Sequence, residues 1–204
     1  MSKITNQTWT SIALSATGIS TAVTGAAAAG FTITNGTLSD GLGHIITFAG
    51  KAATNYSSRT VTIVGTDENG NRQTDVIAAG PNGVASVSSA KYFKTVTSIV
   101  MSGATSGVDT FDIGYTAGSA AAWIRPYLES VAPINIGIAV AWTSGTYSVS
   151  YTYDGVTWTA PTALSAKGAS AVDVSLLPAV AWRQTFTAAG TTTLTFIQAG
   201  PVGN

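Results

Sequence analysis

The sequence has no cysteine, a single histidine and few charged residues, and each shortage excludes a class of function. Without cysteine, the chain cannot form disulfides, thiolate nucleophiles or zinc–thiolate sites. With His44 as its one histidine, it cannot build a metal site from several imidazoles. A Ser-His-Asp catalytic set would have to use this same residue. The functions that remain depend on surfaces more than on reactive side chains.

Charged residues make up only 9% of the 204 residues, against about 25% in a typical globular protein. Nine Lys and Arg balance nine Asp and Glu, and no basic block is present. Because phosphate binding depends on clustered Lys and Arg, we expect no nucleic-acid partner. Charge repulsion keeps soluble monomers apart, so a chain this weakly charged is expected to bury surface in a homo-oligomer or a larger assembly.

Hydrophobic residues reach 45%, yet no apolar run is long enough to span a bilayer. The segment from Ile12 to Thr24 is interrupted by serine and threonine, so it lacks the continuous apolar core of a signal peptide. We therefore expect neither a membrane partner nor export through a signal peptide.

Threonine, serine, valine, isoleucine and glycine dominate the chain and favour short strands joined by turns. The clearest hairpin has alternating residues at Thr60–Val64, a turn at Asp67–Asn71 and a return strand at Thr74–Ile77. Tyr92–Met101 is predicted to be one long strand. The sequence thus predicts an all-β protein.

A second hairpin is predicted around Asn35-Gly36, because both residues tolerate the positive φ of tight hairpin turns. Its strands would be Phe31–Thr34 and His44–Phe48. Farther along, Asn135–Trp142 and Tyr147–Tyr153 are strand candidates.

The uncharged stretch around Ser119 indicates a boundary between two halves. We predict an N-terminal arm (1–29), an anchoring and oligomerising β-domain (30–118) and a second β-sandwich domain (119–204). Both domains are expected to be small antiparallel sandwiches or jelly-roll-like folds.

No segment carries a convincing catalytic or cofactor motif. Gly41-Leu42-Gly43 lacks the rest of a dinucleotide fingerprint. Asp67–Asn71 has part of the spacing of an EF-hand loop but lacks the twelfth-position Glu and flanking helices, which favours a hairpin turn. Acid pairs for glycoside hydrolysis are conceivable, but the sequence places no two carboxylates at the required separation. We predict no catalytic residue, no metal and no cofactor.

The segment Tyr151–Trp158 resembles a degenerate Asp-box of sialidase-type propeller hairpins. It occurs once and lacks one residue between Asp154 and Gly155, whereas a propeller requires repeated blades. We interpret it as a structural hairpin with Trp158 packed on the turn. The alternative is an exposed glycan or partner contact, for which the candidate residues are Trp142, Tyr151, Tyr153 and Trp158.

Four segments resemble a widespread group of small virion proteins of tailed bacteriophages: Thr66–Asn71, Gly80–Gly83, Tyr92–Ile99 and the closing stretch Ala181–Gly200. None of them is a catalytic motif. The resemblance implies assembly into a virion, within a group that includes capsid decoration proteins, head fibres and tail components.

From this resemblance we expect a structural virion protein, foremost a capsid decoration (cement) protein that stabilises the head shell, and no enzyme. It would be located in the virion after assembly in the host cytoplasm. Its partners would be the major capsid protein or other virion proteins and copies of itself, a trimer being one candidate. The alternatives are a tail, adaptor or fibre component and a carbohydrate-binding adhesin module.

Overall fold

The structure is a computed structural model that describes residues 3–24, 30–126, 135–175 and 179–199. Strands make up more than half of the described residues, which contain only one short helical turn, the 3₁₀ segment Thr162–Leu164. The predicted all-β class is therefore confirmed. The chain divides into two compact units: unit 1 comprises residues 1–12 and 121–204, and unit 2 comprises residues 13–120.

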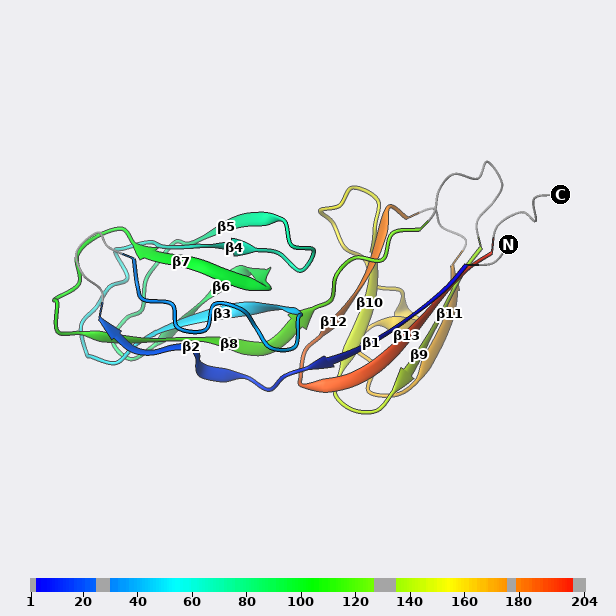
Figure 1. Cartoon of the computed structure of the whole chain (residues 1–204), viewed down its shortest axis with the longest axis horizontal. Helices are drawn as coiled ribbons and strands as arrows, with labels where there is room; N and C mark the ends of the chain where they lie inside the picture. Colours follow the sequence, from blue (N-terminus) through cyan, green and yellow to red (C-terminus); the bar gives the residue numbers. More distant parts are fainter. Residues whose placement is uncertain (1–2, 25–29, 127–134, 176–178, 200–204) are drawn as a thin grey trace. The chain divides into compact units, whose positions relative to one another are not determined.

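Unit 2 contains two antiparallel sheets (Figure 1). The first sheet is formed by β2 (Ser15–Thr24), β8 (Thr110–Ala120), β3 (Gly43–Gly50) and β6 (Ser86–Phe93). The second sheet is formed by β5 (Arg72–Ile77), β4 (Val61–Thr66) and β7 (Thr95–Met101).

The core of unit 2 lies between these sheets and is built on phenylalanine. The ring of Phe111 stacks on Phe48 with centroids 4.9 Å apart and meets Phe31 edge-on at 5.2 Å. Ile63 of β4 and Ile99 of β7 are fully buried in the same cluster. The unit is therefore a β-sandwich, because side chains of both sheets fill one apolar layer.

The hairpin predicted around Asp67–Asn71 is confirmed. Strands β4 and β5 pair in register from Val61 with Ile77 to Thr66 with Arg72. Gly70 occupies the left-handed region with φ +86°, which glycine adopts without a steric penalty.

The hairpin predicted around Asn35-Gly36 is wrong. Phe31–Thr34 is not a strand, and the segment runs beside β7, where Phe31 N–H donates to the Ile99 carbonyl at 2.8 Å. A Cβ on Gly36 would lie 2.4 Å from the Val96 carbonyl oxygen. Glycine is needed here for close backbone approach, so the Asn-Gly pair signals contact with a neighbour instead of a tight turn.

The single strand predicted over Tyr92–Met101 is split at Lys94. The part before Lys94 ends β6 in one sheet, and the part after it begins β7 in the other sheet. Lys94 N–H donates to the Thr66 carbonyl at 2.9 Å, outside both strands. A continuous β-prone sequence therefore crosses from one layer of the sandwich to the other.

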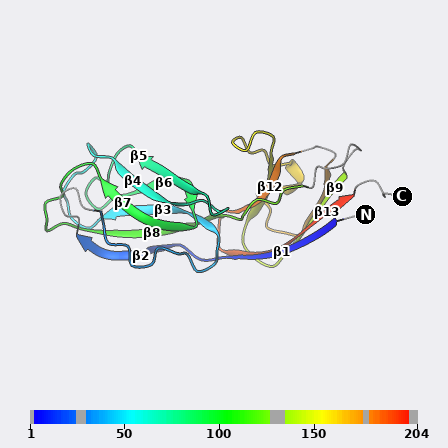
Figure 2. The same cartoon turned by 45° about the horizontal axis from the view of Figure 1, so that its top comes forward.

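Unit 1 contains a four-stranded sheet and a further antiparallel pair of strands (Figure 1), and Figure 2 shows β1 beside β13 in a second orientation. The larger sheet has the order β1 (Lys3–Ser11), β13 (Gly190–Ala199), β9 (Asn135–Trp142) and β11 (Ala171–Ser175). The smaller part is the antiparallel pair of β10 (Tyr147–Thr152) and β12 (Ala181–Phe186). Strands predicted over 135–142 and 147–153 are thus present. Trp182 of β12 is fully buried and faces Phe196 of β13, with ring centroids 6.3 Å apart.

The N-terminal segment differs from the predicted arm. Residues 3–11 form β1 and pair with β13 in unit 1, whereas residues 15–24 form β2 and pair with β8 in unit 2. Alternating threonines favour an extended strand here, and Thr8 Oγ1 lies 2.8 Å from Thr193 Oγ1 on the partner strand. The second segment of unit 1 begins at residue 121, close to the domain boundary that the sequence predicts near Ser119. The alanines at 26–29 lie outside the described residues.

Candidate functional site

Two groups of side chains in the described residues combine polar or aromatic chemistry with a defined geometry. The first surrounds His44 in unit 2. The second surrounds Trp158 in unit 1 and includes three of the four contact residues predicted from the sequence.

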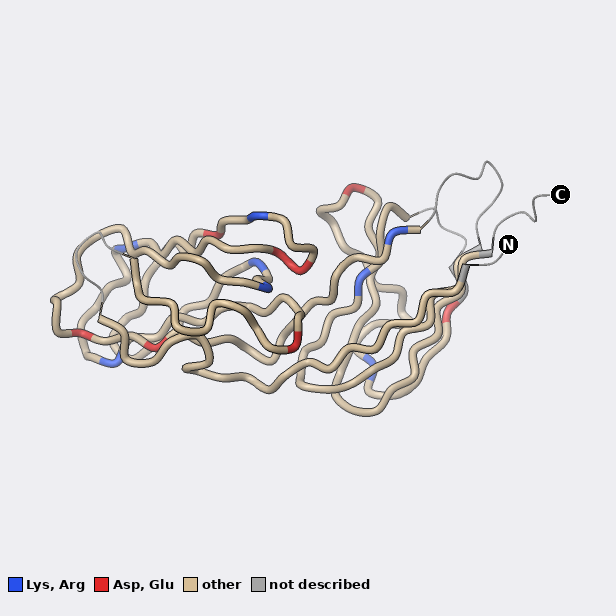
Figure 3. The backbone as a smooth tube through the Cα atoms, viewed as in Figure 1, with Lys and Arg blue, Asp and Glu red and all other residues tan. Residues whose placement is uncertain are grey.

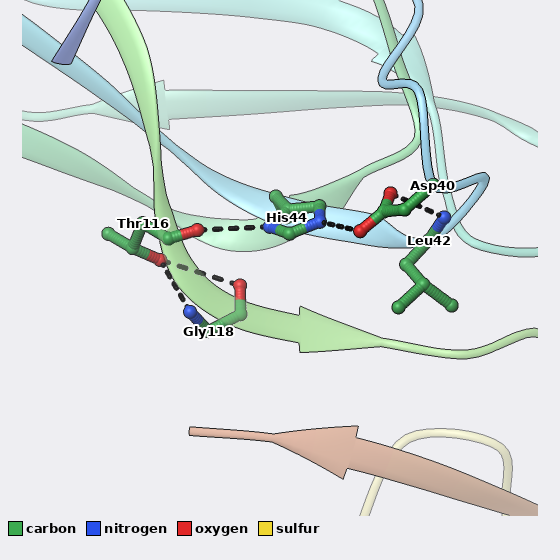
Figure 4. Close-up of polar contacts among 5 residues, drawn as sticks. All are labelled: Asp40, Leu42, His44, Thr116 and Gly118. Carbon is green, nitrogen blue, oxygen red and sulfur yellow. Dashed lines mark hydrogen bonds and ion pairs between the residues drawn. The ribbon is translucent and has the colours of Figure 1, made fainter. Parts of the chain in front are cut away.

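His44 lies at the second position of β3, between β8 and β6, with a fully buried ring. Figure 4 shows its two nitrogens engaged on opposite sides. Nδ1 lies 2.9 Å from the Thr116 carbonyl oxygen, and Nε2 lies 2.8 Å from Asp40 Oδ2. The other carboxylate oxygen, Asp40 Oδ1, accepts the N–H of Leu42 at 3.0 Å. The cluster thus ties the loop before β3 to β8.

The contacts around His44 engage both of its ring nitrogens. A carbonyl oxygen can only accept, so Nδ1 carries a hydrogen and donates it to Thr116. Nε2 lies 2.8 Å from Asp40 Oδ2, so the second ring nitrogen also has a hydrogen-bond partner. Neither ring nitrogen is left to take a proton from a nucleophile. In this arrangement His44 has a structural role.

The second group is an aromatic ladder, defined as Arg183, Trp158, Trp123 and Arg125. The Arg183 guanidinium carbon lies 4.1 Å from the centroid of the Trp158 ring. Trp158 meets Trp123 edge-on at 5.2 Å, and the Arg125 guanidinium carbon lies 5.5 Å from the centroid of Trp123. Each contact is favourable because a cation is attracted to an aromatic face and a ring edge to a neighbouring face.

The ladder borders the loop after β10, which is organised by Asp154. One carboxylate oxygen, Asp154 Oδ1, accepts the N–H groups of Val156 at 2.8 Å and Thr157 at 2.7 Å, together with the Thr152 hydroxyl at 3.0 Å. These hydrogen bonds, that from Val156 foremost, hold the pKa of Asp154 well below its usual range. The predicted Asp-Gly turn is present, with Gly155 at φ +76°. Trp123, and not Trp158, is the ring nearest to Gly155: a Cβ there would lie 3.7 Å from it.

The predicted contact residues fall into two places. Tyr151 and Tyr153 meet edge-on at 5.3 Å, and Tyr153 is 51% exposed. Trp158 follows them in the same loop region as part of the aromatic ladder. Trp142 lies at the end of β9 in the other sheet of the unit, where its Nε1–H donates to the Gly145 carbonyl at 2.8 Å. Trp142 therefore belongs to a separate part of the surface.

Sequence reasoning missed Trp123, Arg125, Arg183 and Asp40. A signal existed for Arg183, because side chains alternate along a strand and its neighbour Trp182 is buried. A signal also existed for Asp40, the acid four residues before the only histidine in a glycine-containing segment. Trp123 and Arg125 lie outside the named strands, in a segment where only Ile124 forms an isolated bridge, and no local pattern marks them.

Within the described ranges, no three His, Asp or Glu side chains gather closely enough to hold a metal ion. The turn that partly resembles a calcium loop uses its acid internally: Asp67 Oδ1 accepts the N–H groups of Asn69 at 2.9 Å and Asn71 at 2.8 Å. The carboxylate thus organises the hairpin turn, as the sequence interpretation favoured.

Comparison with known proteins provides no family. No protein-family model matches the sequence, and no curated protein is significantly similar to it. Among the described residues, none forms a helix long and apolar enough to cross a lipid bilayer.

Proposed function

We propose that the protein is a structural component of a tailed-bacteriophage virion, and specifically a capsid decoration protein that acts as a homo-oligomer on the head shell. One observation carries the proposal: of the segments that resemble phage virion proteins, two form the Asp67–Asn71 hairpin and the β6–β7 crossover of unit 2, and the closing stretch includes β12 and β13 of unit 1. The resemblance thus falls on elements that build a sandwich and not on a reactive site.

The engagement of the polar groups supports a role that depends on surfaces. The ring nitrogens of His44 are both bonded inside unit 2, and the carboxylates of Asp67 and Asp154 are occupied by their own turns. Catalysis requires groups that interact more strongly with a transition state than with a substrate. The hydrogen bonds of these three side chains stabilise the fold itself.

The mechanism would be mechanical. A protein that binds the assembled shell, and not its separated subunits, stabilises the shell by linkage. Weakly charged β surfaces suit this role because few charges lose their hydration on contact. In the proposal, unit 2 contacts the shell and unit 1 extends the exposed surface.

Copy number in purified particles tests the proposal directly. Quantitative mass spectrometry of virions from the source of this sequence should find the chain at a copy number comparable to that of the major capsid protein. A handful of copies per particle would instead support the tail, adaptor or fibre alternative. Absence of the chain from the particles would contradict both.

A second candidate function, contact with a glycan, is favoured by the exposed ring of Tyr153, which meets the ring of Tyr151 edge-on. An aromatic ring fixed in place can stack on a sugar with little loss of side-chain entropy. Glycan-array binding of the intact protein, with Tyr153→Ala as the test variant and Tyr92→Ala in unit 2 as the control, would detect this function. Loss of a glycan signal in Tyr153→Ala alone would support it.

A further inference from the structure

The outward side of the larger sheet in unit 1 is uncharged across all four strands. We name it the threonine face. Its described positions are Ile4, Asn6, Thr8 and Thr10 of β1, Thr191, Thr193, Thr195 and Ile197 of β13, Gly137, Ala139 and Ala141 of β9, and Val172 of β11. The register places these residues side by side. The alternate residues of β13, among them Leu194 and Phe196, are buried on the opposite side of the sheet.

The face combines a hydroxyl array with an apolar border. Thr8 Oγ1 lies 2.8 Å from Thr193 Oγ1, and Thr10 Oγ1 lies 3.0 Å from Thr191 Oγ1. At the other end, Ile4 and Ile197 are register partners and are 61% and 37% exposed. Val172 on β11 is 70% exposed. β13 contains no Lys, Arg, Asp or Glu, and most of the tube in Figure 3 has the tan colour of uncharged residues.

We infer that the threonine face binds the same face of a second copy of this chain. A two-fold interface brings each surface against itself, so its groups must be compatible with their own kind. Carboxylates or ammonium groups would repel across such an axis, whereas a hydroxyl is both donor and acceptor and can pair with another hydroxyl. The face therefore meets the chemical condition for self-recognition at every described position.

The size of the face also suits two copies. Four strands at the usual spacing of about 4.8 Å and about eight residues at about 3.4 Å each give a patch of roughly 19 by 27 Å. Two such faces in contact would bury roughly 1,000 Å², the lower limit for a specific interface. Small side chains such as Thr193 and Ala139 allow the close approach of two aligned sheets.

This inference rests on the homo-oligomeric state included in the proposed function, and it moves self-association from residues 30–118 to unit 1. It can fail independently of the virion proposal, because it is measured in solution without particles. A chain found at high copy number on particles but monomeric in solution would contradict only this inference.

The first test is the mass of the full-length protein by light scattering across a concentration series. We expect a dimer or a multiple of it, and we expect Thr193→Lys to weaken association at least tenfold, about 1.4 kcal/mol. Thr185→Lys is the matched control: it adds the same charge to β12, a strand of the other sheet in unit 1. Circular dichroism melting of both variants checks that they remain folded. A monomeric wild type, or equal weakening by both substitutions, would overturn the inference.

The second test uses the absence of cysteine from the native chain. Thr195→Cys introduces a single thiol on the threonine face, and Thr185→Cys introduces one on β12. Under mild oxidation we expect a covalent dimer from Thr195→Cys at protein concentrations where Thr185→Cys forms no disulfide-linked dimer. Equal cross-linking of the two variants would reflect random collision and would contradict the assigned face.

Discussion

The two units place their aromatic residues differently. In unit 2, phenylalanines close on one another inside the sandwich, with Phe111 at the centre of contacts to Phe31, Phe48 and Tyr56. In unit 1, one buried tryptophan, Trp182, joins the sheets, and further aromatic rings continue into partly exposed loops. All five tryptophans of the chain lie in unit 1.

This difference indicates a division between interior and surface. A phenylalanine cluster offers only apolar area and serves the core. Tryptophan and tyrosine have a polar end and suit positions where one side is packed and the other faces water or a partner. Unit 2 therefore resembles a scaffold, whereas unit 1 presents two distinctive surfaces, the aromatic ladder with its loop and the threonine face.

The largest effect is expected from Phe111→Ala in unit 2. Removing a buried phenylalanine destabilises a protein by about 3–5 kcal/mol, because the apolar contacts are lost and a cavity remains. Tryptophan fluorescence reports only on unit 1, whereas far-UV circular dichroism reports on both units. We expect the melting temperature followed by circular dichroism to fall, whereas the melting temperature followed by fluorescence stays unchanged. Phe186→Ala in unit 1 is the counterpart and should lower the fluorescence transition. Equal changes of both melting temperatures in both variants would contradict the division of the chain into two separately stabilised units.

A smaller loss of stability is expected from Asp40→Ala. This substitution removes the hydrogen-bond partner of His44 Nε2 and of the Leu42 N–H. Leaving buried polar groups unsatisfied costs about 1–3 kcal/mol. Asp40→Asn is the control, because its amide can accept from Leu42 and donate to Nε2 of a neutral imidazole. Urea denaturation followed by circular dichroism should rank the stabilities as wild type, Asp40→Asn, Asp40→Ala. If the Asn variant were as unstable as the Ala variant, the two hydrogen bonds of the Asp40 side chain would not explain the loss of stability.

The next largest loss of stability is expected from Gly70→Val in the turn between β4 and β5. Nothing lies within 4 Å of a Cβ at this position, so the substitution creates no clash. The backbone is left-handed at φ +86°, and a β-branched residue there costs about 1 kcal/mol or more. Gly70→Asn should cost less, because Asn tolerates this conformation. Thermal melting of the two variants measures the difference, and identical melting temperatures would contradict a purely backbone origin.

The smallest effect concerns the loop held by Asp154. Its pKa in the folded loop is depressed, so its stabilising contribution is present above the ordinary carboxyl pKa of about 4 and is lost only as the pH falls through the lower folded value. We expect the tryptophan emission of the wild type to stay constant on acidification to about pH 4. Asp154→Ala should shift the emission already at neutral pH, because Trp123 lies against this loop. An acid titration that changes the wild-type emission near the ordinary pKa would contradict the depressed value.

Local patterns in the sequence predicted the elements whose partners are close along the chain. The alternation in Thr60–Val64 and the Asp67–Asn71 turn define a hairpin without outside help, and both are present. The failures depend on distant partners. Gly36 is placed by Val96, and β1 is a strand because β13, far along the chain, supplies its hydrogen bonds. The local sequence of a single β-prone segment does not show whether a distant strand is available to pair with it.

In the candidate site, too, residues that are close along the chain were predicted and contacts between distant residues were not. Tyr151, Tyr153 and Trp158 were found because they are neighbours in a recognisable hairpin. Arg183 reaches Trp158 from a strand that pairs with β10, a relation set by the register of Tyr151 with Trp182. Residues in such cross-strand contacts become visible only when the pairing of strands is known.

The pairing of β1 with β13 has a consequence for the order of folding. Thr8 and Thr193 are separated by 185 positions, and the whole of unit 2 lies between them in the sequence. Because a chain is synthesised from its N-terminus, unit 2 is complete while β1 still lacks its partner. Closing so long a loop is slow compared with local pairing. During that interval β1 has an unsatisfied edge, which β13 of another copy can fill when newly made chains are crowded together.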